Sequence, residues 1–355
     1  MKFAVIGAGC GGKSMAAELK AQGAQVALSD RNAETIETIR QAGSIRLTGK
    51  IELEGTPDLL TTDNAAAAKD ANVVMVVTTT DAHDAVAASI APVLRDGQVI
   101  VLNPGMFLGS VAFHAALKRA GCTADVTVAE TADLMYTCRM APDGTVFHSG
   151  LKKSMRFAAE HAADTEKVGK LLQPWFPVLT PVENILYTGL SSMGAALHCV
   201  PMLMNANRID CGERFEYYTQ GITQSVARLC EAVDHERVAL AAALGIQVAG
   251  AVQGLRAAYG LDGKTLYDCV TGCKAYAGIM APSTLEHRFC REDTYGSLTA
   301  YASVADTIGV PTPAIHAVIT CISLITGVDY MTVGRTAEHM GVAGMTAAQI
   351  CELVR

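Results

Sequence analysis

The first half of the chain consists of short apolar runs separated by amphipathic segments. The apolar runs predict strands at Phe3–Ile6, Gln25–Leu28, Val73–Val77, Gln98–Leu102 and Val126–Glu130. Continuous apolar runs of this length are typical of parallel strands that are buried on both faces. The segments between them predict helices at Met15–Lys20, Ala33–Ala42, Asn64–Lys69, Ala82–Val93, Gly109–Ala120 and Thr165–Gln173. This order predicts a doubly wound α/β domain around a parallel sheet.

Weaker patterns predict three smaller β features in the same half. Ile45–Leu53 is expected to form a small hairpin around Thr48-Gly49-Lys50. Tyr136–Arg139 and Thr145–His148 are expected to form edge strands.

After Glu183 the strand pattern disappears and helical periodicity continues to the end of the chain. The expected helices are Thr188–Asn207, Thr219–Leu244, Val248–Tyr259, Thr265–Thr271, Ser297–Ile308, Ala314–Thr326 and Thr346–Val354. A chain of 355 residues is also long for a single hydrophobic core. We therefore predict two domains, an α/β domain over residues 1–182 and an all-α domain over residues 183–355.

The first strand leads directly into a glycine-rich turn and a helix. Gly7, Gly9 and Gly12 give the pattern G-x-G-x-x-G. A helix N-terminus offers unpaired N–H groups, and glycines let a diphosphate approach the backbone closely. This arrangement predicts a Rossmann-type dinucleotide site.

The same residues also fit the phosphate loop of nucleoside triphosphatases, because Gly7 to Ser14 matches G-x-x-x-x-G-K-[ST]. Asp30 favours the dinucleotide interpretation, since it ends the second strand 18 residues after Gly12, where a carboxylate binds ribose hydroxyls. A triphosphatase needs an acidic residue after a later strand to hold magnesium. The strand Val73–Val77 is followed instead by Thr78-Thr79-Thr80.

Further polar residues follow the other predicted strands. Ligands bind beyond the carboxyl ends of the strands in sheets of this kind. The candidate cofactor-binding residues there are Thr78, Asn103, Gly105 and Glu130, together with Asp30 and Arg31. Arg31 leaves the cofactor open between NAD(H) and NADP(H), because an arginine after the acidic residue can bind a 2′-phosphate.

Composition excludes several classes of function. Half of the residues are hydrophobic, 18% are charged, and the formal net charge is −7. That charge argues against nucleic acid and anionic membranes as partners. No apolar run reaches the ~18–20 residues of a membrane span, and the first strand starts too early to follow a signal peptide. The eleven cysteines have no zinc-site spacing and fit free thiols, so we expect a cytoplasmic protein without a metal.

His198 stands apart from the other histidines. It lies in the first predicted helix of the second domain, next to small residues and three positions before Pro201. Asn205 follows seven residues later and falls within about 20° of His198 around a regular helix. Periodicity alone leaves His198 open between a catalytic role and a buried structural one.

Several stretches of the chain, taken in order, resemble the opine dehydrogenase family of the octopine and nopaline dehydrogenase type. They are Gly7–Gly12, Asn103–Gly105, Glu130-Thr131, Thr137–Arg139, Leu197–Asn205, Tyr217-Tyr218, Gly221–Thr223, Tyr276–Ile279, Arg288–Asp293, Val310–Pro313 and Gly334–Thr336. The resemblance covers nearly the whole chain. The segment Cys199-Val200 departs from the family pattern, which leaves the substrate side-chain pocket undefined.

The resemblance implies a reductive condensation. An amino acid and a 2-oxo acid form an imine, which NAD(P)H reduces to a secondary amine. It also implies a catalytic pair of His198 and Asp293, in which the carboxylate orients the imidazole. Because both substrates are acids, Arg288 is a candidate for binding them, and the family stretches add Asn205 and Tyr217.

Two other interpretations remain at this point. A ketone reductase of the ketopantoate reductase type has the same architecture, although such enzymes typically carry a lysine and a glutamate in the helical domain. A cofactor-binding sensor without turnover is the other alternative. Helical second domains often dimerise, so the sequence leaves a homodimer open.

Overall fold

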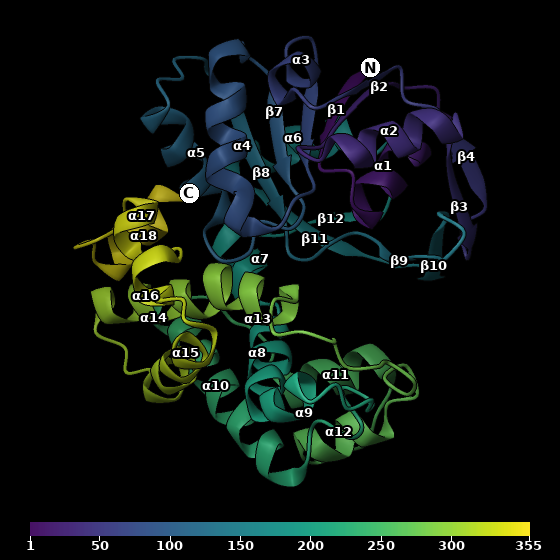
Figure 1. Cartoon of the computed structure of the whole chain (residues 1–355). Coiled ribbons are helices and arrows are strands. Elements are labelled where there is room, and N and C mark those ends of the chain that lie inside the picture. Colours follow the sequence, from purple (N-terminus) through teal and green to yellow (C-terminus); the bar gives the residue numbers. More distant parts are fainter. The chain divides into compact units, whose positions relative to one another are not determined.

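The computed structural model describes all residues from Met1 to Arg355, and their packing divides the chain into two compact units (Figure 1). One unit is Met1–Thr188 with Val354–Arg355, and the other is Gly189–Leu353. The two last residues return to the first unit because the N–H of Ala162 donates to the carbonyl of Val354 at 3.0 Å. The division thus falls after Thr188, whereas the predicted boundary lies between residues 182 and 183.

The first unit is built on an eight-stranded sheet with the order β12-β11-β8-β7-β6-β1-β2-β5. Its strands are β1 (Lys2–Ile6), β2 (Gln25–Ser29), β5 (Leu59–Thr61), β6 (Val73–Val76), β7 (Val99–Leu102), β8 (Thr127–Thr131), β11 (Met155–Ala159) and β12 (Leu179–Pro181). All pairs from β5 to β8 are parallel, which confirms the predicted α/β core. The sheet is mixed, however, because β11 pairs antiparallel with β8. The sequence patterns do not predict β5, β11 or β12.

A second, four-stranded sheet has the order β4-β3-β10-β9. It contains β3 (Ile45–Gly49), β4 (Leu53–Gly55), β9 (Thr137–Met140) and β10 (Val146–Gly150). A hairpin is present as predicted, since β3 and β4 pair antiparallel, but Thr48 and Gly49 belong to β3 and the connection lies at residues 50–52. The two predicted edge strands, β9 and β10, belong to this sheet and not to the large one. In β10, buried Val146 and His148 alternate with exposed Phe147, as expected for a strand with one face on the core.

Helices cover both faces of the large sheet. They are α1 (Cys10–Ala21), α2 (Ala33–Ala42), α3 (Asn64–Ala68), α4 (His83–Ile90), α5 (Gly109–Arg119) and α6 (Thr165–Leu172), with short 3₁₀ turns at Thr80–Ala82, Ala91–Val93 and Ala162–Asp164. Phe3 and Val5 of β1 pack in one core with α1, α2 and α6. Ala4 and Ile6 point to the opposite face and pack with α3, α4 and α5. The alternation along one strand therefore separates two apolar cores, as a doubly wound sheet requires.

The second unit is all α-helical. After α7 (Ile185–Leu190), which spans the division in the sequence, its helices are α8 (Gly194–Met204), α9 (Ala206–Asp210), α10 (Gln224–Ala243), α11 (Ala251–Tyr259), α12 (Leu266–Gly272), α13 (Arg288–Asp293), α14 (Thr299–Ile308), α15 (Pro313–Thr326), α16 (Tyr330–Val333), α17 (Ala337–Met340) and α18 (Ala347–Leu353). A π-helical turn over Thr294–Leu298 joins α13 to α14.

The observed helices of this unit differ from the predicted ones in two respects. The single helix predicted over Thr188–Asn207 is broken, because α7 ends at Leu190 and α8 starts at Gly194. At the start of α8, the hydroxyl of Ser192 accepts a hydrogen bond from the N–H of Gly194 at 3.2 Å. The predicted set also lacks α13, α16 and α17, which are too short to show an apolar period.

No single helix has the length and apolar composition of a membrane span, although α15 passes that test together with the bent segment Tyr330–Met340. The cytoplasmic location remains a prediction.

Candidate active site

The glycine turn has the geometry that its pattern predicts. Gly7 has a φ of +103°, and a Cβ there would lie 2.7 Å from the carbonyl oxygen of Val77. A Cβ on Gly12 would lie 1.7 Å from the carbonyl oxygen of Gly7. Both positions therefore require glycine, because no side chain tolerates such distances.

Gly9 differs from its two neighbours in the pattern. It lies directly before α1 with a φ of −67°, and a Cβ there would meet nothing within 4 Å. Packing within the chain does not demand a glycine here, so the space above the helix N-terminus is open. An open space at an N-terminus with unpaired N–H groups fits a diphosphate.

Asp30 joins this turn to the end of β2. Its Oδ2 accepts a hydrogen bond from the N–H of Ala8 at 2.7 Å, and its Oδ1 accepts one from Asn32 at 2.9 Å. The neighbouring Arg31 is exposed. The carboxylate thus lies beside the glycine turn, as the dinucleotide interpretation expects.

Ser14 has a different role from the one that a phosphate loop would give it. Its hydroxyl donates to the carbonyl of Cys10 at 2.8 Å and lies 2.8 Å from Nε2 of His148. The side chain is fully buried. A hydroxyl held in this way is not placed to bind magnesium, which favours the dinucleotide interpretation over the triphosphatase one.

Two polar side chains at the other strand ends carry buried atoms without a partner. The hydroxyl of Thr78 is one, and Nδ2 of Asn103 is the other. The Oδ1 of Asn103 accepts hydrogen bonds from the Thr131 hydroxyl and from the N–H of Met135, both at 3.1 Å. Unpaired buried groups of this kind are rare in proteins and are typical of places where a ligand binds.

Glu130 is fully buried at the end of β8, where its carboxylate accepts three hydrogen bonds. The N–H and hydroxyl of Ser110 donate to Oε2 at 2.8 and 2.9 Å, and the Thr188 hydroxyl donates to Oε1 at 2.7 Å. Gly105 packs directly against it, since a Cβ there would lie 2.4 Å from the Glu130 Cβ. These contacts give Glu130 a role in fixing the segment from Gly105 to Ser110.

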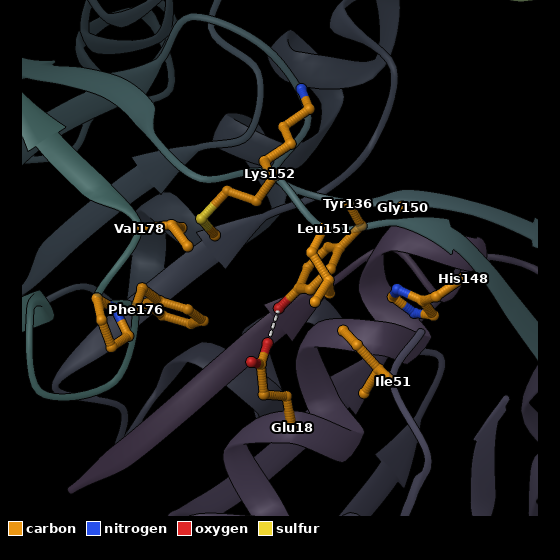
Figure 2. Close-up of a pocket in the computed structure, with 11 residues that line it drawn as sticks. Glu18, Ile51, Tyr136, His148, Gly150, Leu151, Lys152, Phe176 and Val178 are labelled. Carbon is orange, nitrogen blue, oxygen red and sulfur yellow. Dashed lines mark hydrogen bonds between the residues drawn. The ribbon is translucent and has the colours of Figure 1, made fainter. Parts of the chain in front are cut away.

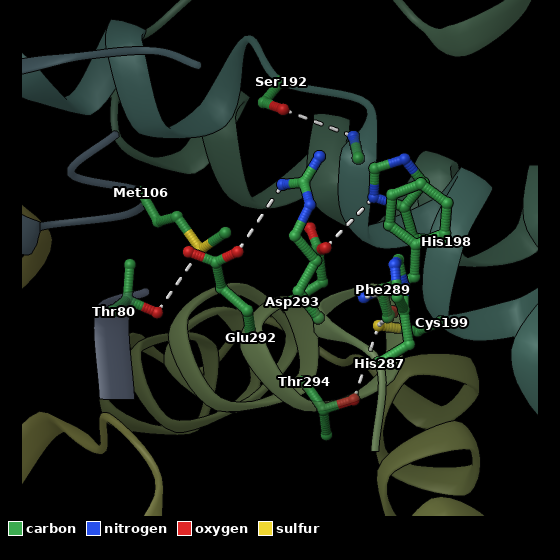
Figure 3. Close-up of polar contacts among 12 residues, drawn as sticks. Thr80, Met106, Ser192, His198, Cys199, His287, Phe289, Glu292, Asp293 and Thr294 are labelled. Atoms are coloured by element: carbon green, nitrogen blue, oxygen red, sulfur yellow. Dashed lines mark hydrogen bonds and ion pairs between the residues drawn. The ribbon is translucent and has the colours of Figure 1, made fainter. Parts of the chain in front are cut away.

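In the helical unit, His198 and Asp293 lie side by side (Figure 3). Nδ1 of His198, on α8, is 3.0 Å from Oδ2 of Asp293, the last residue of α13. The side chain of Asp293 is 6% exposed and that of His198 is 19% exposed. The carboxylate holds the proton on Nδ1, so Nε2 is left as the atom that can exchange a proton at the surface.

Three neighbours surround the His198–Asp293 pair. The ring of Phe289 stacks on it with a centroid distance of 3.9 Å and an angle of 13°. The Tyr217 hydroxyl donates to the His198 carbonyl at 2.6 Å. A Cβ on Gly194 would lie 3.0 Å from Oδ1 of Asp293, so the residue one turn before His198 must be small.

The three predicted substrate-binding residues differ in their placement. Asn205 is buried, and its Nδ2 donates to the carbonyls of Pro201 and Gly221, both at 2.9 Å. Tyr217 is also buried, which raises the pKa of its hydroxyl well above the ordinary value. Only Arg288 is substantially exposed, at 47% of its side chain, and its guanidinium lies 3.6 Å from the buried Glu292.

Sequence reasoning missed Phe289 as a part of the site. Phe289 lies within the Arg288–Asp293 stretch, but an aromatic residue there gives no sign that it stacks on a ring 91 positions earlier. Gly194 is one of the small residues that the sequence places beside His198, and a helical residue four positions before His198 shares its face.

Comparisons with known proteins agree with this architecture. Residues 181–326 match the α-helical domain of NAD/NADP octopine/nopaline dehydrogenases, and residues 2–124 match the NAD-binding domain of 6-phosphogluconate dehydrogenase. The chain is 38% identical to the opine dehydrogenase of Arthrobacter sp. (strain 1C) over 354 residues, which cover 98% of this chain and 97% of that relative.

Solved structures give the same picture of the fold. Octopine dehydrogenase with NADH and L-arginine has a TM-score of 0.83 at 21% identity, covering 99% of this chain and 98% of that one. Yersinopine dehydrogenase with NADP⁺ has a TM-score of 0.72 at 16% identity, covering 100% and 97%. Fold and matching domains together define an NAD(P)-dependent oxidoreductase. The chain belongs to the opine dehydrogenase family, which confirms the resemblance drawn from its sequence.

Proposed function

We propose that this enzyme condenses the amine of an amino acid with a 2-oxo acid and reduces the resulting imine to a secondary amine. The condensation releases one water, and the reduction consumes one hydride and one proton. The observation that carries the proposal is the His198–Asp293 pair at 3.0 Å, in a chain of the opine dehydrogenase family. The solved octopine dehydrogenase with L-arginine and NADH supports an amino acid as one substrate.

Nε2 of His198 is the proton-exchanging atom in this proposal. Loss of water from the adduct of amine and oxo acid requires a proton on the departing hydroxyl, and the imidazolium at Nε2 supplies it. Asp293 stabilises the charged ring through Nδ1, and Phe289 keeps the ring plane fixed. The nicotinamide cofactor supplies the hydride when it is bound.

The first unit would hold the cofactor through groups already described. Gly7, Gly9 and Gly12 form the turn for the diphosphate, and Asp30 would bind a ribose. The unpaired groups of Thr78 and Asn103 are the next candidates. Gly105 and Glu130 would act indirectly, by shaping the segment that leads to Ser110.

Cofactor choice depends on Asp30 and Arg31. The carboxylate favours NADH, whereas the exposed guanidinium suits the 2′-phosphate of NADPH. Asp30→Ala should weaken NADH binding far more than NADPH binding. If Arg31→Ala lowers NADPH affinity and leaves NADH affinity unchanged, Arg31 binds the phosphate.

Arg288 is the proposed contact for a substrate carboxylate, because its exposed guanidinium lies 5.3 Å from the centre of the Phe289 ring, which stacks on His198. Asn205 and Tyr217 would support the site through the α8 backbone, since their polar atoms are already bonded there. Arg288→Ala should then raise KM for the acid substrates more than it lowers kcat.

Product analysis tests the reaction itself. Incubation with NADH, pyruvate and a mixed amino acid pool should give a product whose mass equals amine plus oxo acid, minus water, plus two hydrogens. Formation of the hydroxy acid alone would show that the enzyme is a simple ketone reductase. The absence of any NADH oxidation across amino acid and oxo acid pairs would favour the sensor interpretation.

A further inference from the structure

The first unit contains a cavity that the proposed reaction does not use (Figure 2). It lies beside α1, is partly open to solvent and has a volume of about 80 Å³ for the centres of water-sized probes. Its apolar lining consists of Ile51, Met135, Leu151, Phe176, Pro177 and Val178. Its polar lining comes from Glu18, Tyr136, His148 and Lys152. The cavity is large enough for a small organic molecule, because one water needs only about 10–15 Å³ of space for its centre.

Only one of the two carboxylate oxygens of Glu18 has a hydrogen-bond partner within the chain. Tyr136 donates its hydroxyl proton to Oε2 at 2.5 Å, and Oε1 has no hydrogen-bond partner. Burial in the apolar surroundings raises the pKa of Glu18. A carboxylate in this setting gains from a ligand that brings a hydrogen-bond donor and a positive charge.

His148 presents a second acceptor of the same kind. It is 1% exposed, and burial lowers its pKa, so the ring is neutral near pH 7. The single proton of the Ser14 hydroxyl goes to the Cys10 carbonyl, so the ring donates from Nε2 to the Ser14 oxygen. Nδ1 is then a bare acceptor, and it is buried without a partner.

Two of the polar lining groups share one chemistry, whereas the Tyr136 hydroxyl and the Lys152 ammonium are donors. Oε1 of Glu18, which has no hydrogen-bond partner within the chain, and the buried, unpaired Nδ1 of His148 both accept hydrogen bonds. The rings of Phe176 and Tyr136 add aromatic surface to the lining, which attracts cations as well as apolar groups. A ligand for this cavity needs an apolar body and a donating, positively charged head.

We propose that this cavity is a second ligand site, for a small apolar primary amine whose ammonium group binds Glu18 and His148. The site lies wholly in the first unit, whereas the proposed catalytic pair lies in the second. It does not rest on the proposed reaction, because its argument uses only the lining residues.

Calorimetric titration with 3-methylbutylamine tests the site, using the full-length protein saturated with NADH. This probe lacks a carboxylate, so it differs from the amino acid substrates of the proposed reaction. Measurable binding is expected, whereas 3-methylbutan-1-ol, which has the same shape but no charge, should bind at least about tenfold more weakly. Equal binding of the amine and the alcohol would overturn the proposal.

Variants then locate the bound amine. Glu18→Gln keeps the bond from Tyr136 but removes the charge, and should weaken amine binding about tenfold to a hundredfold. Glu166→Gln is the matched control, because Glu166 is an exposed carboxylate on α6 that pairs only with Lys170. Val178→Phe, which fills part of the cavity, should also abolish binding. Retention of full affinity in Glu18→Gln, or its loss in Asp293→Asn, would show that the amine binds elsewhere.

Discussion

The two units form their sites in opposite ways. In the first, the cofactor turn is made by neighbouring residues, Gly7 to Gly12, and its backbone geometry requires glycine at both of those positions. In the second, the proposed catalytic pair joins His198 to a carboxylate 95 residues later, and side chains alone fix the geometry. Binding and chemistry should therefore be separable by mutation, since one site depends on backbone and the other on side chains.

The largest expected effect separates chemistry from binding. His198→Ala should lower kcat by about 10²–10⁴, because general acid–base help contributes that much. The Kd for NADH should stay unchanged, since the first unit makes those contacts. Added imidazole should restore part of the rate to this variant, and stopped-flow kinetics with fluorescence titration of NADH would measure both quantities.

A matched pair on the protein surface provides the control. His316 lies 3.1 Å from Asp306, with 37% of its side chain exposed, and has no proposed function. His316→Ala should leave kcat unchanged. A near-normal kcat in folded His198→Ala would mean that His198 is a structural histidine, and that the proton donor is another residue.

The second effect is on the free energy of unfolding and tests how much a buried ion pair stabilises the helical unit. Asp234 and Arg237 form a fully buried ion pair on α10, with Nη2 of Arg237 2.6 Å from Oδ1. Arg237 also donates to the Leu190 carbonyl, and Asp234 accepts from the N–H of Ala251 at 2.5 Å. Asp234→Ala should therefore lower the free energy of unfolding by about 3–5 kcal/mol, because it leaves a buried charge unpaired.

Denaturant unfolding would measure this loss against a surface pair. Glu213→Ala breaks the exposed pair with Arg208 and should lower the free energy of unfolding far less, because solvent screens that pair. If the two variants lose the same free energy of unfolding, the buried pair does not stabilise the start of the helical unit more than a surface pair would.

The third effect lies in the glycine turn and contrasts two of its positions. Gly9→Ala adds a methyl group where nothing lies within 4 Å, so the free energy of unfolding should stay unchanged. NADH affinity should fall about tenfold, or about 1.4 kcal/mol, because the methyl group occupies the space proposed for the diphosphate. Gly12→Ala should instead destabilise the unit by about 1–3 kcal/mol through overpacking. If NADH affinity is unchanged in Gly9→Ala, the diphosphate does not bind at this turn.

The same contrast explains what the sequence could predict. The α/β half, the glycine turn and Asp30 were predictable, because each depends on residues within one or two elements. The second sheet as a unit could not be predicted, since the parallel pairing of β3 with β10 joins segments about a hundred residues apart. Periodicity alone also left His198 undecided. The pairing of His198 with Asp293 came only from the family resemblance, and Phe289 could not be predicted because stacking depends on how α13 packs on α8.

The smallest expected effect concerns Glu18, at the far end of the helix that begins at the glycine turn. Its folded-state pKa lies above the ordinary value of 4.5, with burial as the main cause and the Tyr136 hydrogen bond opposing it. The folded protein therefore binds this proton more tightly than the unfolded chain does. The stabilisation that this provides is fully present below pH 4.5 and is lost as the pH rises through the folded-state pKa.

Glu18→Gln should remove the loss of stability at higher pH, because glutamine does not ionise. Its amide oxygen still accepts the hydrogen bond from Tyr136. At about pH 4 the variant and the parent protein should have nearly equal free energies of unfolding. At about pH 7 the variant should be the more stable, because the parent protein then carries a buried charge that the glutamine lacks. Urea unfolding at both pH values measures this, with Glu166→Gln as the exposed control. If the variant is less stable than the parent at neutral pH, the ionised Glu18 stabilises the fold. The carboxylate would then have a cationic partner within the chain, and a bound amine would not be needed to pair with it.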